Sequence, residues 1–292
     1  MQGIAILRSC LQLINVPYWA VFGLLVMVTP SSYGDTDVSL NIPATSQRFI
    51  TKHLLYETGV QALLQQLPDL IEEEMNNLQS SALSLTPAQW AHIHSAFNGE
   101  KVVANLKHSL LNSLQKDMGI ERLQQIKQLL QVVDVVRFKH LKRNVDNESA
   151  YARIRQYKAM IDDKMPLISR VQLIERLDDA LWLSRLEAEM KVALRKNLLA
   201  TVSWVTEREV FSEEALEQEM MDYRQRVAAQ IDDNARVYYL YLLKATTGQA
   251  VRSLTAVYQQ PQFEGFMKQC ESTILDTFQQ QRIGLLDQVV SR

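Results

Sequence analysis

The sequence contains little cysteine. Among its 292 residues only Cys10 and Cys270 are cysteines, so at most one intramolecular disulfide bond is possible. This scarcity excludes the small, disulfide-stapled architectures that are common outside eukaryotic cells. It also excludes a Cys-x-x-Cys redox or metal motif, because the two cysteines stand far apart in the chain.

Glycine and proline are also scarce. Nine glycines and seven prolines are few for this length, and beyond the first 34 residues most of them stand at junctions between segments of helical period. With 47% hydrophobic residues, the composition is that of a folded globular protein and excludes a disordered chain. The sequence therefore predicts an all-α fold, a multi-helix bundle.

Neither sign of charge dominates. The 31 lysines and arginines and the 33 aspartates and glutamates give a net charge of −2, and the two signs are interspersed. This pattern argues against a nucleic-acid-binding surface. One basic run, Arg137–Arg143, falls on a helical pattern. We interpret it as a solvated helix face, with a patch for anionic lipid or another polyanion as the alternative.

The sequence lacks the strong catalytic motifs. It has no glycine-rich phosphate loop, no Gly-x-Ser-x-Gly elbow and no His-Glu-x-x-His zinc helix. We therefore predict no catalytic residue, no metal site and no cofactor. An enzyme whose groups come together only in the fold is the alternative.

The first 34 residues have the pattern of a secretory signal peptide. Arg8 is their only charged residue, an uncharged stretch that includes 16–28 follows it, and Ser32 and Gly34 supply small side chains. A basic start, an apolar core of ~7 to 15 residues and small residues at the cleavage site are what signal peptidase recognises. Cleavage after Gly34 removes 34 of the 292 residues and leaves 258. The alternative is a retained anchor, since 11–28 approaches the ~17 residues that span a membrane.

Cleavage would leave Cys270 as the only cysteine of the mature chain. An exported helical protein without a disulfide bond is typical of a bacterial periplasm. We expect that location, with membrane contact only through the signal segment if it stays uncleaved.

The rest of the chain divides into four segments. Residues 35–45 are polar and lack a sustained period, so we expect a flexible leader. A helical repeat at 46–145, a connecting segment at 146–165 and a second helical repeat at 166–292 follow. A shift of 119 residues aligns 53–55 with 172–174. Because the matches are mostly leucines at helical spacing, which any two amphipathic helices share, duplication is a hypothesis.

The clearest helix start is at Thr86 and Pro87. Threonine is a preferred N-cap, proline suits the first helical position, and Gln89 is placed to reach back to the cap. Pro68 similarly suits the first turn of a helix that follows the apolar stripe ending at Leu67. Further helix starts are expected near Gly99, Ile120, Asn147, Pro166, Ser212 and Pro261.

Aromatic residues are the candidate ligand-binding groups, namely Tyr238, Tyr241 and Trp182. Tyr238 and Tyr241 share one face of a helix, and tyrosine combines an apolar body with a hydroxyl group. The alternative is core packing, which is the usual role of an aromatic stripe.

Other reactive residue types have structural explanations. His92 and His94 are two positions apart and point to different faces of a helix, whereas two ligands need a spacing of four. Cys270 falls on an apolar stripe and is expected to be a buried hydrophobe. The acidic groups at 72–74 and 162–163 are expected to be surface charge.

The segment Tyr239–Gln249, followed by Tyr258–Phe263, resembles a family of exported bacterial all-helical proteins catalogued only as a domain of unknown function. The likeness is best over 213–282. The family implies a periplasmic protein with an aromatic-rich helix that breaks at a short glycine-containing turn, and it supplies no catalytic residue. Many relatives have Ser-Pro where this chain has Thr246 and Thr247. We expect Gly248 to end the helix in a left-handed cap, or alternatively to allow two helices to approach closely.

Together these features favour a non-enzymatic exported protein whose helical halves form a grooved surface for a protein, a peptide or an apolar ligand. The alternatives are an unrecognised periplasmic hydrolase and an envelope chaperone. No nucleic acid is expected as a partner.

Overall fold

The computed structural model describes residues 44–80, 85–145, 148–164, 166–206 and 212–290. Within these ranges every regular element is an α-helix, which confirms the predicted all-α multi-helix bundle. The predicted signal peptide at 1–34 and the predicted leader up to residue 43 lie outside the described residues. Helix α2 starts at Ala44, so its first two residues fall within the predicted leader.

The first half of the described chain contains α2 (Ala44–Glu57), α3 (Val60–Ser80), α4 (Pro87–Ala96), α5 (Gly99–Asp117), α6 (Ile120–Leu129) and α7 (Val133–Val145). The predicted connecting segment is largely helix α8 (Glu148–Asp163). The second half contains α9 (Ile168–Leu181), α10 (Leu183–Val205), α11 (Glu213–Leu242), α12 (Gly248–Tyr258) and α13 (Pro261–Val290).

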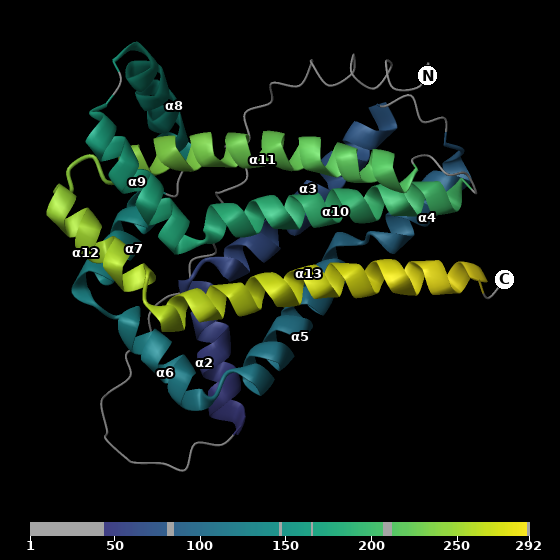
Figure 1. Ribbon diagram of the computed structural model, residues 1–292, viewed down its shortest axis with the longest axis horizontal. Coiled ribbons are helices and arrows are strands. Elements are labelled where there is room, and N and C mark those ends of the chain that lie inside the picture. Colours follow the sequence, from purple (N-terminus) through teal and green to yellow (C-terminus); the bar gives the residue numbers. More distant parts are fainter. Residues whose placement is uncertain (1–43, 81–84, 146–147, 165, 207–211, 291–292) are drawn as a thin grey trace.

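Three long helices form a layer along the longest dimension of the molecule. Helix α10 lies between α11 and α13 and packs against both (Figure 1). Helix α5 packs against α13, and α3 packs against both α5 and α10. Helices α7, α8, α9 and α12 gather at one end, on the left of Figure 1. Helices α9 and α12 pack against each other at this end.

One continuous hydrophobic core joins the two predicted repeats. Its largest fully buried side chains include Phe97 from the first repeat and Phe263, Phe266 and Phe278 from the second. Contacts of α3 with α10, of α5 with α13 and of α7 with α12 cross between the repeats. Each fully buried leucine or phenylalanine contributes roughly 1.5 to 3 kcal/mol, so this shared core holds the two repeats together. The duplication itself stays a prediction.

The helix start at Thr86 is confirmed. The Thr86 hydroxyl accepts a hydrogen bond from the Gln89 amide at 3.3 Å, and the Gln89 side chain accepts one from the Thr86 amide at 2.8 Å. The starts expected near Gly99, Ile120, Ser212 and Pro261 are also confirmed, and α9 begins two residues after Pro166. The start expected at Asn147 lies outside the described residues, and α8 is described from Glu148.

The helix start expected at Pro68 is wrong. Pro68 lies inside α3, and the chain turns instead at Thr58 and Gly59. A proline within a helix removes one backbone hydrogen bond at a cost of about 3 kcal/mol. The burial of Leu67 and Ile71 on either side of it offsets this cost, since neither side chain is exposed. Gly99 also packs directly on Pro68, where a Cβ atom would lie 2.9 Å from the proline Cα.

Two helix corners have left-handed backbone conformations. Gly59 joins α2 to α3 with φ +89°, and Trp182 joins α9 to α10 with φ 67°. The two corners meet, because a Cβ atom on Gly59 would lie 3.1 Å from Cδ1 of Leu183. An L-residue pays roughly 1 to 2 kcal/mol for this conformation, so Trp182 is held there by its surroundings.

The left-handed cap expected at Gly248 is wrong. Helix α11 ends at Leu242, and Gly248 is the first residue of α12 after the N-cap Thr247, with no positive φ. The Thr247 hydroxyl accepts a hydrogen bond from the Ala250 amide at 3.3 Å. Threonine is a preferred N-cap residue, and the capping hydrogen bond of Thr247 places Gly248 at the start of a helix rather than at the end of one.

Candidate functional site

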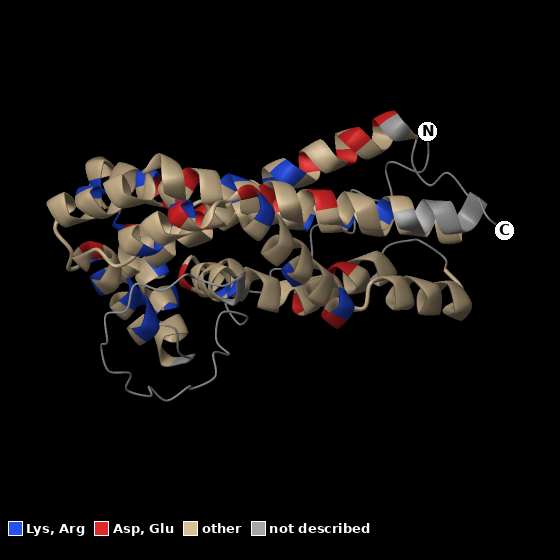
Figure 2. Ribbon diagram, turned by 90° about the horizontal axis from the view of Figure 1, so that it is seen from below, with Lys and Arg blue, Asp and Glu red and all other residues tan. Residues whose placement is uncertain are grey.

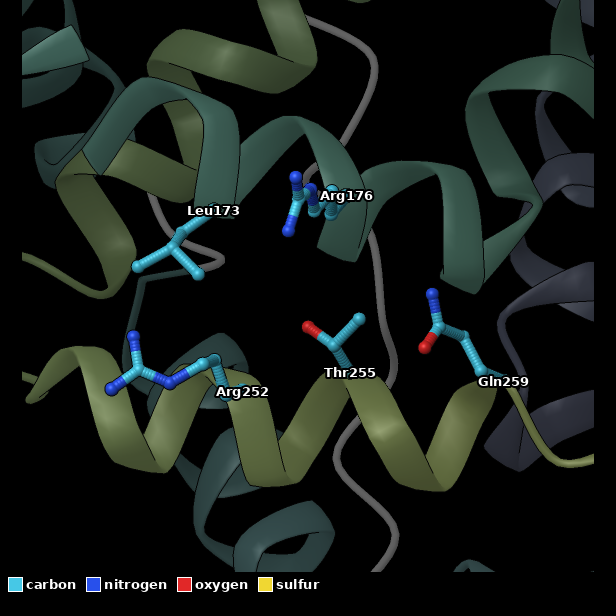
Figure 3. A pocket seen from close by; sticks show the side chains of 5 residues that line it. All are labelled: Leu173, Arg176, Arg252, Thr255 and Gln259. Carbon is cyan, nitrogen blue, oxygen red and sulfur yellow. The ribbon is translucent and has the colours of Figure 1, made fainter. Parts of the chain in front are cut away.

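A hollow of about 250 Å³ lies between α9 and α12. Leu173 and Arg176 of α9 line one side of it, and Arg252, Thr255 and Gln259 of α12 line the other (Figure 3). We call this the α9–α12 hollow. Arg176, Arg252 and Gln259 are exposed, so the hollow is open to solvent.

Helix periodicity explains why these side chains face one another. On α12 the buried residues Val251, Leu254 and Tyr258 share the face that enters the core. Arg252 and Gln259 follow at the edge of that face, next to α9. On α9 the stripe of Ile174 and Leu177 is buried, which leaves Leu173 and Arg176 beside α12.

The polar groups of the hollow are mainly hydrogen-bond donors. Arg252 donates from Nη2 to Oε1 of Gln249 at 3.1 Å, which leaves its other N–H groups for a ligand. The Thr255 hydroxyl donates to the carbonyl oxygen of Val251 at 2.9 Å. The five lining residues include two guanidinium groups and neither a carboxylate nor an imidazole. This arrangement suits the binding of a negatively charged or hydrogen-bond-accepting group.

Tyr241 and Tyr238 do not line the α9–α12 hollow. Tyr241 is 8% exposed and belongs to a small second core with Tyr151, Ile154 and Val237, formed between α8 and α11. Its ring meets Tyr157 edge-on, with 5.5 Å between centroids, and its hydroxyl accepts a hydrogen bond from Nε of Arg153 at 3.2 Å. Tyr238 is half-buried against the same core. These contacts agree with the packing alternative.

Trp182 lies at the corner between α9 and α10. Its indole N–H donates to Oε2 of Glu271 on α13 at 3.0 Å. The guanidinium carbon of Arg185 lies 4.6 Å from its ring centroid, and Nζ of Lys268 lies 5.6 Å away. The ring therefore links the corner to α13 through contacts within the chain. None of the three predicted ligand-binding residues lines the α9–α12 hollow.

Cys270 is fully buried, as expected from its stripe, and burial raises the pKa of its thiol. His92 and His94 are both exposed on α4. In the described part of the chain, no three histidine, cysteine or acidic side chains are grouped so that they could hold a metal ion. Asp162 and Asp163 are exposed, as expected.

The expectation of surface charge is wrong for Glu74. Its side chain is 9% exposed and accepts a hydrogen bond from Nη1 of Arg195 at 2.9 Å. The Tyr223 hydroxyl donates to its other oxygen at 2.7 Å. Glu219 also contacts Arg195, at 3.2 Å. Burial works to lower the pKa of Arg195, but Glu74, Tyr223 and Glu219 outweigh it and raise that pKa.

A second buried carboxylate, Asp178, lies near the end of α9. Burial raises the pKa of Asp178 to about 7, and the nearby charges of Asp232, Asp179 and Glu187 act in the same direction. The Ser184 hydroxyl donates to Asp178 at 2.7 Å, which opposes the shift. Asp178 is buried, and the charged groups that raise its pKa are other acids. Its ionisation therefore affects the stability of the fold rather than ligand binding.

Within the described ranges, no helix combines the length and the apolar character that crossing a membrane requires. Comparison with known proteins found no matching family model, no matching curated protein and no matching solved structure.

Proposed function

We propose that this chain is exported to a bacterial periplasm and acts there as a non-enzymatic binding module for another polypeptide. Its contact site would be the α9–α12 hollow. The observation that carries this proposal is the open shape and the lining of the hollow. At about 250 Å³ it is smaller than the ~300 to 1,000 Å³ of sites that enclose a small molecule. A space of this size suits a single side chain of a partner.

Exposed apolar side chains at the start of α9 support the same proposal. Leu167 is 79% exposed and Ile168 is 76% exposed, although both are large and hydrophobic. Leu167 directly precedes α9, the helix that also supplies Leu173 and Arg176 to the hollow. Apolar side chains near polar and cationic groups are typical of protein interfaces, where arginine is enriched.

Cross-linking in intact cells tests the binding proposal. A photo-reactive residue replaces Gln259, which lines the hollow, and in a matched control it replaces Asp162, which is exposed on α8. We expect a discrete protein adduct at position 259 and none at position 162. Equal adducts at both positions, or none at either, would contradict the proposal. Turnover of ester, phosphate or peptidoglycan substrates that is lost on one point substitution would favour the hydrolase instead.

Export is tested separately by the mass of the chain isolated from an expressing Gram-negative bacterium. Cleavage after Gly34 predicts a mature chain that begins at Asp35 and is released with the periplasmic fraction. A chain of full mass in the membrane fraction would show instead that the N-terminal segment is a retained anchor.

A further inference from the structure

We propose that the α9–α12 hollow binds a carboxylate group carried by an acidic segment of the partner polypeptide. This inference rests on the proposed function, because it assigns a chemistry to the partner at the same site. It is carried by the two arginines, by the contacts that the neighbouring acids make, and by the apolar side chain beside them.

The two arginines come from different helices and both line the hollow, and the Arg252 side chain extends back along α12 toward Gln249. Arg176 lies across the hollow from Thr255, and Arg252 lies across from Leu173 (Figure 3). The other three lining residues are uncharged, so the lining has a net positive charge. Guanidinium groups bind carboxylates through paired hydrogen bonds, and these are stronger than bonds between neutral groups.

Two of the three acidic residues of α9 contact other helices, and the third, Asp179, acts with Glu175 to raise the pKa of Asp232 on α11, after burial as the main cause. Glu175 lies 4.0 Å from Nη1 of Arg236 on α11. Asp178 is buried and accepts its hydrogen bond from Ser184 on α10. Helix α12 contains no acidic residue, and Arg252 is its only charged one. No residue of α12 therefore neutralises the arginines.

The end of the molecule formed by α7, α8, α9 and α12, on the left of Figure 2, carries both basic and acidic positions. The positive charge is therefore local to the lining of the hollow, and its attraction for a negatively charged partner weakens as salt increases.

The apolar side chain of Leu173 favours some anionic ligands over others. It gives the hollow an apolar wall opposite Arg252, against which the methylene groups of a glutamate side chain can pack. An inorganic phosphate has no apolar part and gains nothing from this wall. A lipid headgroup would place its acyl chains away from a space of only about 250 Å³. The geometry therefore favours a glutamate-containing peptide.

The test uses the chain as isolated from the cell envelope and two fluorescent twelve-residue peptides. One has four glutamates separated by glycine, serine and leucine, and the other has glutamine at the same positions. We expect the glutamate peptide to bind at least ~10-fold more tightly at low salt, and to weaken at about 0.5 M salt. In nitrogen-detected spectra, the side-chain Nε signals of Arg176 and Arg252 should shift on titration.

Three variants separate a specific site from overall charge. Arg176→Gln and Arg252→Gln should each weaken binding of the glutamate peptide by roughly 5-fold or more. Arg155→Gln removes the same charge from an exposed position on α8 and should leave binding unchanged. All three positions are on the surface, so folding is checked by an unchanged melting temperature.

Several results would overturn the proposal. They are equal binding of the two peptides, an equal loss in Arg155→Gln, or tighter binding of inorganic phosphate or of phosphatidylglycerol vesicles than of the glutamate peptide. If a partner cross-links at position 259 but the glutamate peptide does not bind, the proposed carboxylate ligand is wrong and the proposed binding function still stands. If the glutamate peptide binds but no adduct forms at position 259 in cells, the proposed binding function is wrong and the hollow still binds a carboxylate.

Discussion

Arg195 of α10 and Glu74 of α3 form an ion pair inside the protein. Nη1 of Arg195 lies 2.9 Å from Oε2 of Glu74, and their side chains are only 8% and 9% exposed. Tyr223 of α11 completes the network, because its hydroxyl hydrogen-bonds Glu74 and its ring lies 4.6 Å from the guanidinium carbon. The network links three helices in one register, since each partner has its position fixed by the other two.

Replacement of one member of this pair should be strongly destabilising. Arg195→Met leaves the Glu74 carboxylate buried without its cation, and we expect a loss of about 3 to 5 kcal/mol in the free energy of unfolding. Urea unfolding measures this loss. The matched control is Arg224→Met, which breaks a pair with Glu189 in which the arginine side chain is 51% exposed, and it should cost no more than ~1 kcal/mol. A loss in Arg195→Met as small as that of the control would contradict the assignment.

The spacing of apolar residues along each helix is enough to place this pair in the core. Glu74 is three residues from Ile71 and four from Leu78, both buried. Arg195 is likewise three residues from Val192 and four from Leu199, which are buried as well. The acidic run at 72–74 obscured this spacing, because three adjacent charges suggest a solvated surface. Two opposite charges that each fall on an apolar stripe are better interpreted as a buried pair.

Gly59 and Gly248 should respond in opposite ways to alanine. Gly59→Ala places a side chain at φ +89° and 3.1 Å from Leu183, and we expect a loss of about 1 to 2 kcal/mol. Gly248→Ala has no positive φ, and its nearest neighbour atom would be 3.5 Å away, at Leu173. It should leave stability unchanged or raise it by up to ~1 kcal/mol. Melting temperatures compare the two variants, and a larger loss in Gly248→Ala would contradict the assigned helix start.

Local sequence rules succeeded where a few adjacent residues decide the outcome. The capping box at Thr86 and Gln89 is contained within four residues, and it was predicted correctly. The helix start predicted at Pro68 was wrong, because burial of the neighbouring side chains outweighs the backbone hydrogen bond that the proline removes. The α9–α12 hollow was not predicted, because Arg176 and Arg252 are brought together only by the packing of helices distant in the sequence. The residue pattern within one helix does not indicate which charged residues of another helix will line the same hollow.

The cap at Thr86 should be worth about 1 kcal/mol. Thr86→Ala removes the hydroxyl that accepts from the Gln89 amide, whereas Thr86→Ser keeps an equivalent acceptor. We expect the alanine variant alone to lower the free energy of urea unfolding and to speed hydrogen exchange at the Gln89 amide. Because Gln89 also donates to the carbonyl of Val205 at 3.2 Å, the end of α10 should loosen with it. Equal stability of the alanine and serine variants would show that the cap contributes nothing.

Asp178 makes stability depend on pH. Its pKa is about 7 in the folded chain, chiefly because of burial, against 3.8 for an unperturbed aspartate. Between these values the folded chain holds a proton that the unfolded chain has released. The contribution of Asp178 to stability is therefore fully present below pH 3.8, declines as pH rises from there to about 7, and is constant above. The whole change is roughly 4 kcal/mol, because one pKa unit corresponds to about 1.4 kcal/mol.

Asp178→Asn should remove this dependence. The amide cannot ionise, so we expect the variant to be more stable than the natural chain at pH 8 and to differ little from it near pH 4. Ser184→Ala is the opposite case, because it removes the hydroxyl that donates to the ionised Asp178 at 2.7 Å, and it should be destabilising mainly at pH 8. Urea unfolding at several pH values measures both variants. If Asp178→Asn instead destabilised the protein at pH 8, the buried carboxylate would be a favourable charge, paired by a group other than Ser184.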